Sequence, residues 1–263
     1  MVHMPKVQRY VSTELTHFVG RGKAPEDQYA LLLLILRGGW LTHPPHNPNE
    51  SGNLFVKRGA SISNNEMYSP QTVCFCDIPT EDLHIHTAKY SSFGLSLSKD
   101  LVARQGGAPV LYLPVDTRIQ ASRGLSTEQI VAAFSENREE DIYGEAPLGE
   151  FFDRMVPEYH ALMELFRQLI MQARQKPGVP EEHRRLMDLR FFLDFRLLSY
   201  VKFFDHTLPD DHPNNFYMER EWRVVGNVQF SLPEVVRVLV PSQYGTQLRK
   251  DVPEFTGQVT FID

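Results

Sequence analysis

The sequence predicts an α+β fold, with a mixed, mostly antiparallel sheet interrupted by a block of helices. Three observations predict it: β-type segments before residue 116, helical periodicity over residues 125–204, and β-type segments again after residue 220. Strands, then helices, then strands are typical of α+β folds rather than of an alternating doubly wound sheet. We therefore expect a single domain over residues 1–263, with a helical insertion at about 125–204.

The N-terminal third predicts a strand, a helix and a long loop. Residues 8–21 mix β-branched and aromatic residues with polar ones, which favours a strand with Leu15, His17 and Val19 on one face. Residues 24–40 predict a helix, because a proline and two acids stand in its first turn and a glycine pair ends it. Residues 41–55 are rich in Pro, Asn, Gly and Ser and predict a loop.

The remaining elements follow from periodicity and from turn residues. We expect a buried strand at 72–79, a short helix at 80–90, a half-buried strand at 93–100 and another strand at 108–116. Apolar residues three and four apart predict an amphipathic helical hairpin from segments 157–175 and 180–204. Strands are expected again at 220–230, 235–240 and 258–262.

Composition limits the class and the compartment of the protein. A net charge of −6 argues against a surface that binds nucleic acid throughout, so a nucleic-acid-binding effector would need a local basic cleft. Cys74 and Cys76 are separated by one residue, which strains a disulfide and favours a reducing cytoplasm. The N-terminus lacks a signal-peptide core, and the apolar run 30–36 is too short for a bilayer. We expect a cytoplasmic protein with no membrane partner.

The stretch YMEREWRVVG, residues 217–226, places two glutamates one residue apart in a segment of strand character. In a strand, Glu219 and Glu221 would point to the same face. One interpretation is a solvated edge strand whose acids pair with arginines. The other is a site where one carboxylate meets a developing positive charge and the second moves a proton.

Other candidate motifs give weaker indications. Cys74, Cys76, His84 and His86 lack the CxxC and HxxxH spacings of zinc sites, and two helical histidines two residues apart cannot share a face, so no metal is expected. Phosphate-binding glycine loops and a GxSxG nucleophile motif are absent. Arg21 lies in a locally basic first segment, which is either a solvated strand end or a contact for a pyrophosphate.

Five phrases carry a resemblance to a known family. In chain order they are RYVSTELTHFVGR, GGWLTHPPHNPNESGNL, EMYSPQTVCFCDIP, YSSFGLSLSKD and EREWRVV. Together they resemble the AbiGi-type abortive-infection family of bacteria, over about residues 8–116 and 217–225. The resemblance implies a role in bacterial defence against phage, and members of the family are often labelled antitoxins.

The chain also resembles the ADP-ribosyltransferase fold in the order of its motifs, which implies a split sheet. A first-strand residue, LLLLILRGGW, a serine and aromatic strand, and a late ExE strand follow in sequence. The resemblance implies that NAD is the substrate, that His17 contacts its ribose, and that Tyr90 or Phe93 lies against nicotinamide. Glu221 then faces the nicotinamide ribose, and Glu219 is the first acid of the pair. YSS at 90–92 or SLS at 96–98 replaces the usual STS strand, and the residues expected at the dinucleotide are Tyr90, Ser91, Phe93, Arg21 and His43.

Two functions therefore compete. The first is an anti-phage effector that acts as an NAD-dependent ADP-ribosyltransferase on a protein or nucleic-acid acceptor. It requires His17 and the Glu219/Glu221 pair to line opposite walls of one pocket. The second is a non-enzymatic antitoxin or phage-sensing protein, whose helical hairpin at 157–204 offers an apolar face to a partner protein.

Overall fold

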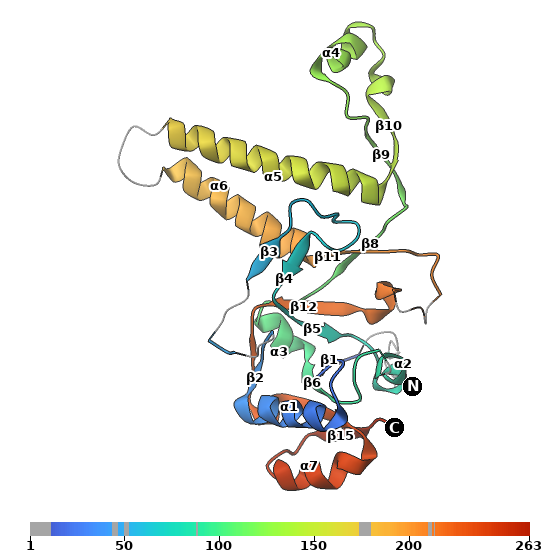
Figure 1. Ribbon diagram of the computed structural model, residues 1–263, viewed down its shortest axis with the longest axis vertical. Helices are drawn as coiled ribbons and strands as arrows, with labels where there is room; N and C mark the ends of the chain where they lie inside the picture. The colour runs from blue at the N-terminus through green and yellow to red at the C-terminus, as the bar shows by residue number, and fades with distance from the viewer. Residues whose placement is uncertain are drawn as a thin grey trace, which may run out of the picture. The chain divides into compact units, whose positions relative to one another are not determined.

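The computed structural model describes residues 12–43, 47–49, 53–87, 89–173, 180–209, 212 and 214–263 (Figure 1). The chain divides into two compact units. Unit 1 comprises Met1–Leu54, Pro70–Val110 and Pro209–Asp263, and unit 2 comprises Phe55–Ser69 and Leu111–Leu208. Unit 2 contains the region expected to be a helical insertion, and the prediction of one domain over the whole chain stays a prediction.

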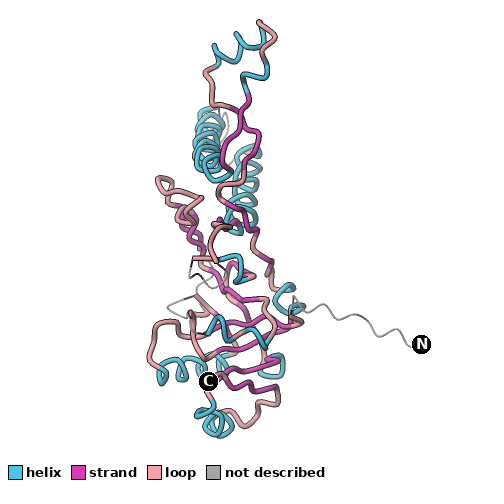
Figure 2. The backbone as a smooth tube through the Cα atoms, turned by 90° about the vertical axis from the view of Figure 1, so that its right-hand side faces the viewer, coloured by secondary structure: helices cyan, strands magenta, loops and turns pink. Residues whose placement is uncertain are grey.

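Unit 1 is built on a seven-stranded sheet (Figure 2). In spatial order its strands are β15 (Gln258–Phe261), β14 (Val235–Val240), β6 (Gly94–Ser98), β1 (Glu14–Phe18), β5 (Thr72–Cys76), β12 (Glu221–Val225) and β7 (Ala108–Pro109). Neighbouring strands are antiparallel except for β14 and β15. The expected α+β class with a mostly antiparallel sheet is confirmed.

One face of this sheet packs against helices α1 (Pro25–Gly38), α3 (Lys99–Arg104) and α7 (Gly245–Asp251), whose apolar residues share a core with Leu15, Phe75 and Leu95 of the sheet. The other face is covered as well, because Thr16 and Ser96 are almost fully buried there and join by a 2.9 Å hydroxyl hydrogen bond. The expectation that the strand at 93–100 is half-buried is therefore wrong.

The ends of α1 follow the sequence rules. Pro25 begins the helix, two acids occupy the first turn, and Gly39 ends it in the left-handed conformation at φ 70°. The Gly39 N–H donates to the Ile35 carbonyl, and a Cβ at this position would lie 2.6 Å from the Phe230 carbonyl oxygen. Glycine is required here both for its positive φ and for this close approach.

Short elements complete unit 1. Strand β2 (Trp40–Leu41) pairs with β13 (Val228–Gln229), and the short helix α2 (His84–Thr87) follows a 3₁₀ turn at Thr80–Asp82. The sequence predicts a single short helix over residues 80–90, but the structure has a 3₁₀ turn followed by the four-residue helix α2.

Unit 2 combines three strand pairs with helices. The pairs are β3 (Leu54–Val56) with β4 (Tyr68–Pro70), β8 (Leu111–Pro114) with β11 (Val201–Phe204), and β9 (Arg118–Ser122) with β10 (Tyr143–Pro147). Helix α4 (Thr127–Ser135) lies between β9 and β10, while α5 (Leu148–Gln172) and α6 (Glu181–Phe191) form the expected hairpin (Figure 1). The apolar core of unit 2 is centred on Ile62, Met67, Val156 and Phe203.

The hairpin differs from the prediction at both ends. Helix α5 begins at Leu148 and continues through Pro157, whereas the sequence placed a helix start at that proline. The second helix ends at Phe191 and is followed by a π-helical segment, Phe192–Leu197, and a 3₁₀ turn. Residues 201–204, which continue the apolar run, pair with β8 as a parallel strand. Periodicity alone does not distinguish a buried strand from a buried helical turn.

Candidate functional site

The glutamate pair of residues 219 and 221 lies in unit 1 but does not share a strand. Glu219 ends a 3₁₀ turn, Phe216–Glu219, and Glu221 begins β12. Between them Arg220 adopts φ 44°, a left-handed conformation that breaks the strand alternation. The expectation that the two acids alternate within one strand is therefore wrong.

Glu219 is nevertheless a buried acceptor with two donors. It is 6% exposed, and its Oε1 lies 2.5 Å from Lys89 Nζ and accepts a short hydrogen bond from the Tyr90 hydroxyl. Burial, followed by the charge of Glu219, raises the pKa of Tyr90 far above its usual value. Tyr90 therefore stays protonated near neutral pH and keeps donating to the carboxylate.

Glu221 is held by an arginine on its own strand. Arg223 Nε lies 2.6 Å from Glu221 Oε1, and its Nη2 lies 3.3 Å from Oε2. Residues two apart in a strand share a face, so this ion pair follows directly from the sequence spacing. Glu221 also stands opposite Cys76 of β5, and burial raises the pKa of the Cys76 thiol to about 12.

An aromatic and basic group surrounds Tyr90. Its ring stacks on Phe18 at 5.6 Å between centroids, and the Arg21 guanidinium lies 5.1 Å from the ring centroid. Both carboxylates lie close enough to contribute to the raised pKa of Tyr90. Arg21, Tyr90, Glu219 and Glu221, four of the residues singled out in the sequence, thus gather in one place, which we name the acid site.

His17 lies on the opposite side of the sheet. The register pairs Thr16 with Cys76 and Cys76 with Glu221, so Thr16 shares the face of Glu221 and the adjacent His17 takes the other face. His17 Nδ1 lies 2.8 Å from the Cys74 carbonyl oxygen, and its ring meets Phe75 edge-on at 5.8 Å. The structure does not bring His17 and the acid pair to opposite walls of one pocket.

The other expected dinucleotide contacts are also distributed elsewhere in unit 1. Ser91 is buried and donates to the Gln28 side chain at 3.1 Å. Phe93 is 1% exposed and packs in the apolar core against the rings of Tyr29 and Tyr244. His43 is exposed in the loop after β2. The binding roles of these residues stay predictions.

Sequence reasoning missed Lys89 and Phe18 as members of the acid site. Lys89 precedes Tyr90 directly, and its Nζ also lies 5.2 Å from the centroid of the Phe216 ring. Its adjacency to Tyr90 was a usable signal, whereas the contact of Phe18 with Tyr90 depends on tertiary structure. With Lys89 and Arg223 in place, the acid site holds two carboxylates that are each paired with a cation.

Unit 2 has a buried polar network of its own. The Tyr68 hydroxyl lies 2.8 Å from His160 Nε2 and donates to Asp194 Oδ1 at 3.1 Å, while Arg190 lies 3.4 Å from the other carboxylate oxygen. Because Tyr68 donates to Asp194, His160 Nε2 must donate to Tyr68. Burial lowers the pKa of His160, so its ring is neutral near pH 7. His160 also lines a hollow of about 330 Å³ together with Arg58, Glu164 and Gln168.

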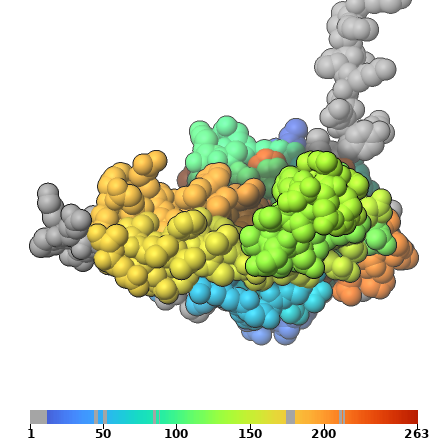
Figure 3. All heavy atoms as spheres, turned by 90° about the horizontal axis from the view of Figure 1, so that it is seen from above, coloured from blue at the N-terminus to red at the C-terminus, as the bar shows by residue number. Residues whose placement is uncertain are grey.

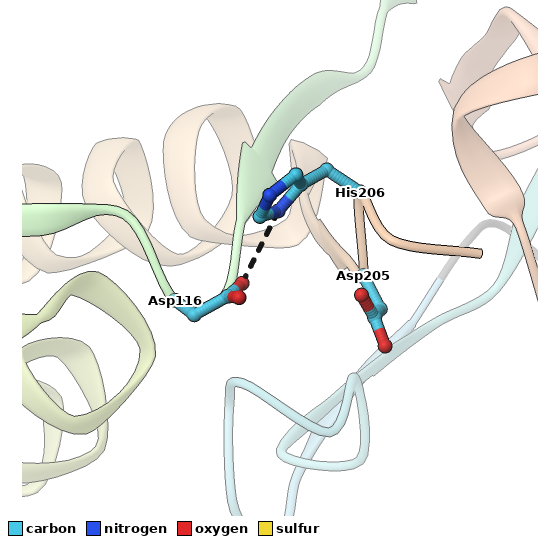
Figure 4. Close-up of side chains that lie close together, drawn as sticks. All are labelled: Asp116, Asp205 and His206. Carbon is cyan, nitrogen blue, oxygen red and sulfur yellow. Dashed lines mark ion pairs between the residues drawn. The ribbon is translucent and has the colours of Figure 1, made fainter.

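Among the described residues, one group combines side chains that bind divalent metals: Asp116, Asp205 and His206 of unit 2 (Figure 4). Their ligand atoms lie within 4.8 Å of one another. His206 Nδ1 lies 3.4 Å from Asp116 Oδ1, and Asp205 Oδ1 accepts hydrogen bonds from the N–H and hydroxyl of Thr207. Asp116 and His206 are exposed and Asp205 is half-buried, and all three already have protein partners.

The described residues form an α+β protein, with a mostly antiparallel sheet in unit 1 and a helical hairpin in unit 2. None of the described helices combines the length and the apolar character of a membrane span. The family model described as "Putative abortive phage resistance protein AbiGi, antitoxin" matches residues 57–243. The chain belongs to this family, as the sequence phrases predicted. No curated protein and no solved structure matches the chain.

Proposed function

We propose that this protein acts in phage defence as an antitoxin, which binds and neutralises a partner protein through the exposed apolar surface of α5 and α6. The observation that supports this proposal most strongly is a second apolar face on α5, separate from the face that packs into the core of unit 2. The description of the family as an antitoxin agrees with a binding function.

The two faces of α5 follow from helical geometry. Gly149, Val156, His160 and Met163 are buried. The second set is 41–51% exposed, and at about 100° per residue it falls within an arc of roughly 100°. Its members are Met155, Leu162, Leu165, Phe166 and Leu169. A helix that packs against a single core needs only one apolar face. We name the second, exposed set of residues the apolar stripe.

Helix α6 also exposes apolar side chains. It has no fully buried residue, and Met187, Leu189 and Phe191 are 38–51% exposed. Contiguous exposed apolar surface of several hundred Å² is typical of protein-binding sites, and each partner in a stable complex contributes roughly 800 Å². A surface of that size favours a protein rather than a small molecule as the ligand. Its burial contributes about 25 cal/mol per Å².

The test is co-expression with the product of the adjoining gene. The native protein should form a complex with that product and relieve any growth arrest that it causes. Leu162→Asp with Phe166→Asp should weaken the complex by at least about ten-fold, because two charges would then be desolvated at the interface. Leu34→Asp is the matched control, since Leu34 is 62% exposed on α1 of unit 1. Equal neutralisation by the stripe variant and the native protein would refute the proposal.

A second candidate function is ADP-ribosyl transfer from NAD at the acid site. The observation that favours it is the grouping of Arg21, Tyr90, Glu219 and Glu221 on one side of the unit 1 sheet. A carboxylate beside the ribose would stabilise an oxocarbenium-like transition state, and a second one would take a proton from the acceptor. For this chemistry, Lys89 and Arg223 must first release the acids that they hold.

The second function has its own test. Purified protein is incubated with NAD and a cell lysate, and nicotinamide release and labelled acceptors are measured. A rate for the native protein that is at least about 10²-fold above that of Glu221→Gln would support transfer. Equal rates for both proteins would eliminate it and leave the antitoxin function unaffected.

A further inference from the structure

From the charge and exposure of one segment of unit 2, we infer that residues 125–145 form a docking surface for a protein that presents a basic surface. We name this segment the acidic arm. The inference rests on the proposed antitoxin function and gives the partner a defined chemistry. The arm comprises α4, a 3₁₀ turn at Glu139–Ile142 and the beginning of β10.

The acidic arm carries most of the net charge of the chain. It contains six acidic residues and one arginine, a net charge of −5 out of −6 for the whole sequence: Glu128, Glu136, Glu139, Glu140, Asp141 and Glu145 against Arg138. Arg138 pairs with Glu136 and Asp141 inside the arm. Glu139 and Glu140 are exposed and form no ion pair with any residue that the structure describes.

The same segment exposes three large apolar side chains. Val131 is 57% and Phe134 is 53% exposed, three residues apart on α4, and Tyr143 is 49% exposed at the start of β10. Only Ala133 of α4 is buried. Figure 3 shows the spheres of this segment, in bright green, uncovered on the face toward the viewer. Exposed apolar side chains together with charged ones are the usual composition of a protein interface.

The short helix α4 is capped at its N-terminus. Ser126 and Gln129 make a reciprocal capping box, with hydrogen bonds of 2.8 and 3.3 Å between side chains and backbone N–H groups. Apolar residues three apart on such a helix fit a groove of a partner protein. The capping box preorganises α4, which lowers the entropy that binding costs.

Charge decides which class of partner fits. Exposed carboxylates repel phosphates and other acidic surfaces over roughly 10 Å at about 0.1 M salt, which disfavours nucleic acid and a second copy of the arm. The hairpin region 148–200 contains eight acidic and eight basic residues, so it selects no charge. A basic protein surface would be attracted to the arm, and the complex would then be completed by apolar burial.

The experiment measures association of the native protein with the adjoining gene product by biolayer interferometry at about 50 and 500 mM NaCl. The arm variant is Glu139→Gln with Glu140→Gln. Its control is Glu66→Gln with Glu254→Gln, two exposed acids outside the arm whose loss changes the net charge equally. We expect the arm variant to associate roughly ten-fold more slowly at low salt and within about two-fold of native at high salt, while the control stays close to native. Phe134→Ser should accelerate dissociation.

The outcomes separate this inference from the proposed function. If the arm variant and Phe134→Ser bind like the native protein while the stripe variant Leu162→Asp/Phe166→Asp does not, the acidic arm is no docking surface and the antitoxin function stands. Slowing that is equal in the arm variant and in the charge-matched control would also overturn the inference. If the native protein forms no complex, the proposed function fails and the inference fails with it.

Discussion

The acid site permits a quantitative prediction for Glu219→Ala. The carboxylate of Glu219 is the acceptor for both Lys89 Nζ and the Tyr90 hydroxyl, inside unit 1. Its removal leaves a charged ammonium and a hydroxyl without this acceptor. The Lys89 side chain is 22% exposed and that of Glu219 is 8% exposed, so water reaches the lysine more than the carboxylate.

The magnitude follows from these exposures. Removing one partner of a buried ion pair costs about 3–5 kcal/mol, and losing a hydrogen bond to a charged group costs about 1.5–3 kcal/mol. These costs overlap, and access of water to Lys89 reduces them. We expect Glu219→Ala to lower the free energy of unfolding of unit 1 by about 2–4 kcal/mol. Glu219→Gln should cost less, because its amide oxygen still accepts from Tyr90.

The assay is urea unfolding followed by tryptophan fluorescence. Both tryptophans, Trp40 and Trp222, lie in unit 1, so their emission reports this unit. Asp100→Ala is the matched control, since it breaks the exposed Asp100–Arg104 pair, whose side chains are 77% and 66% exposed, and should cost at most about 1 kcal/mol. A double-mutant cycle of Lys89→Met and Glu219→Ala should give a coupling of about 1–3 kcal/mol.

A small effect of Glu219→Ala would show that this ion pair does not stabilise unit 1. If Glu219→Ala costs no more than Asp100→Ala, or if the cycle shows no coupling, the pair contributes nothing to stability. The acid site would then resemble an ordinary surface pair, despite its burial.

Three further predictions concern single buried groups. Phe93→Ala should lower the free energy of unfolding of unit 1 by about 3–5 kcal/mol in the same fluorescence assay, because Phe93 is 1% exposed in the core, and a loss below about 1 kcal/mol would contradict that position. Burial lowers the pKa of His160, so the unfolded chain binds a proton first and stability should fall as the pH drops below about 6.5. Urea unfolding at pH 7 and 5, followed by circular dichroism, should show this loss, and His160→Gln should reduce it. Burial raises the pKa of Cys76 to about 12, so the thiol ionises first in the unfolded chain. The free energy of unfolding should therefore fall as the pH rises above about 8.5. Cys76→Ala should flatten that fall, and an unchanged slope would exclude Cys76 as its source.

The parts of the fold that were predicted well depend on local rules. Helix α1 has a proline at its start, acids in its first turn and a left-handed glycine at its end, and each of these acts within a few residues. The strands β5, β6 and β14 follow from short β-rich segments in the same way. The start of α5 was missed because Pro157 satisfies the rules for a first turn and also stands within the longer helix.

The candidate site was predicted only in part. Tyr90, Glu219, Glu221 and Arg21 do gather, but the sequence argument for the two acids assumed one continuous strand. Arg220 interrupts that strand, and the two acids have different partners. His17 was assigned to the same pocket from chain order alone, which contains no information on the face of the sheet.

The sequence by itself determined the α+β class, the family, the hairpin and the end of α1, because these depend on periodicity, phrase order and local capping. The tertiary structure alone decided that Glu219 binds Lys89 and Tyr90, 130 and 129 residues away in the chain. It also decided that His17 and Glu221 occupy opposite faces, through the pairing of β1 and β12 with β5. The physical reason is strand register, since a shift of one residue moves a side chain to the other face, and register depends on long-range pairing that local sequence does not specify.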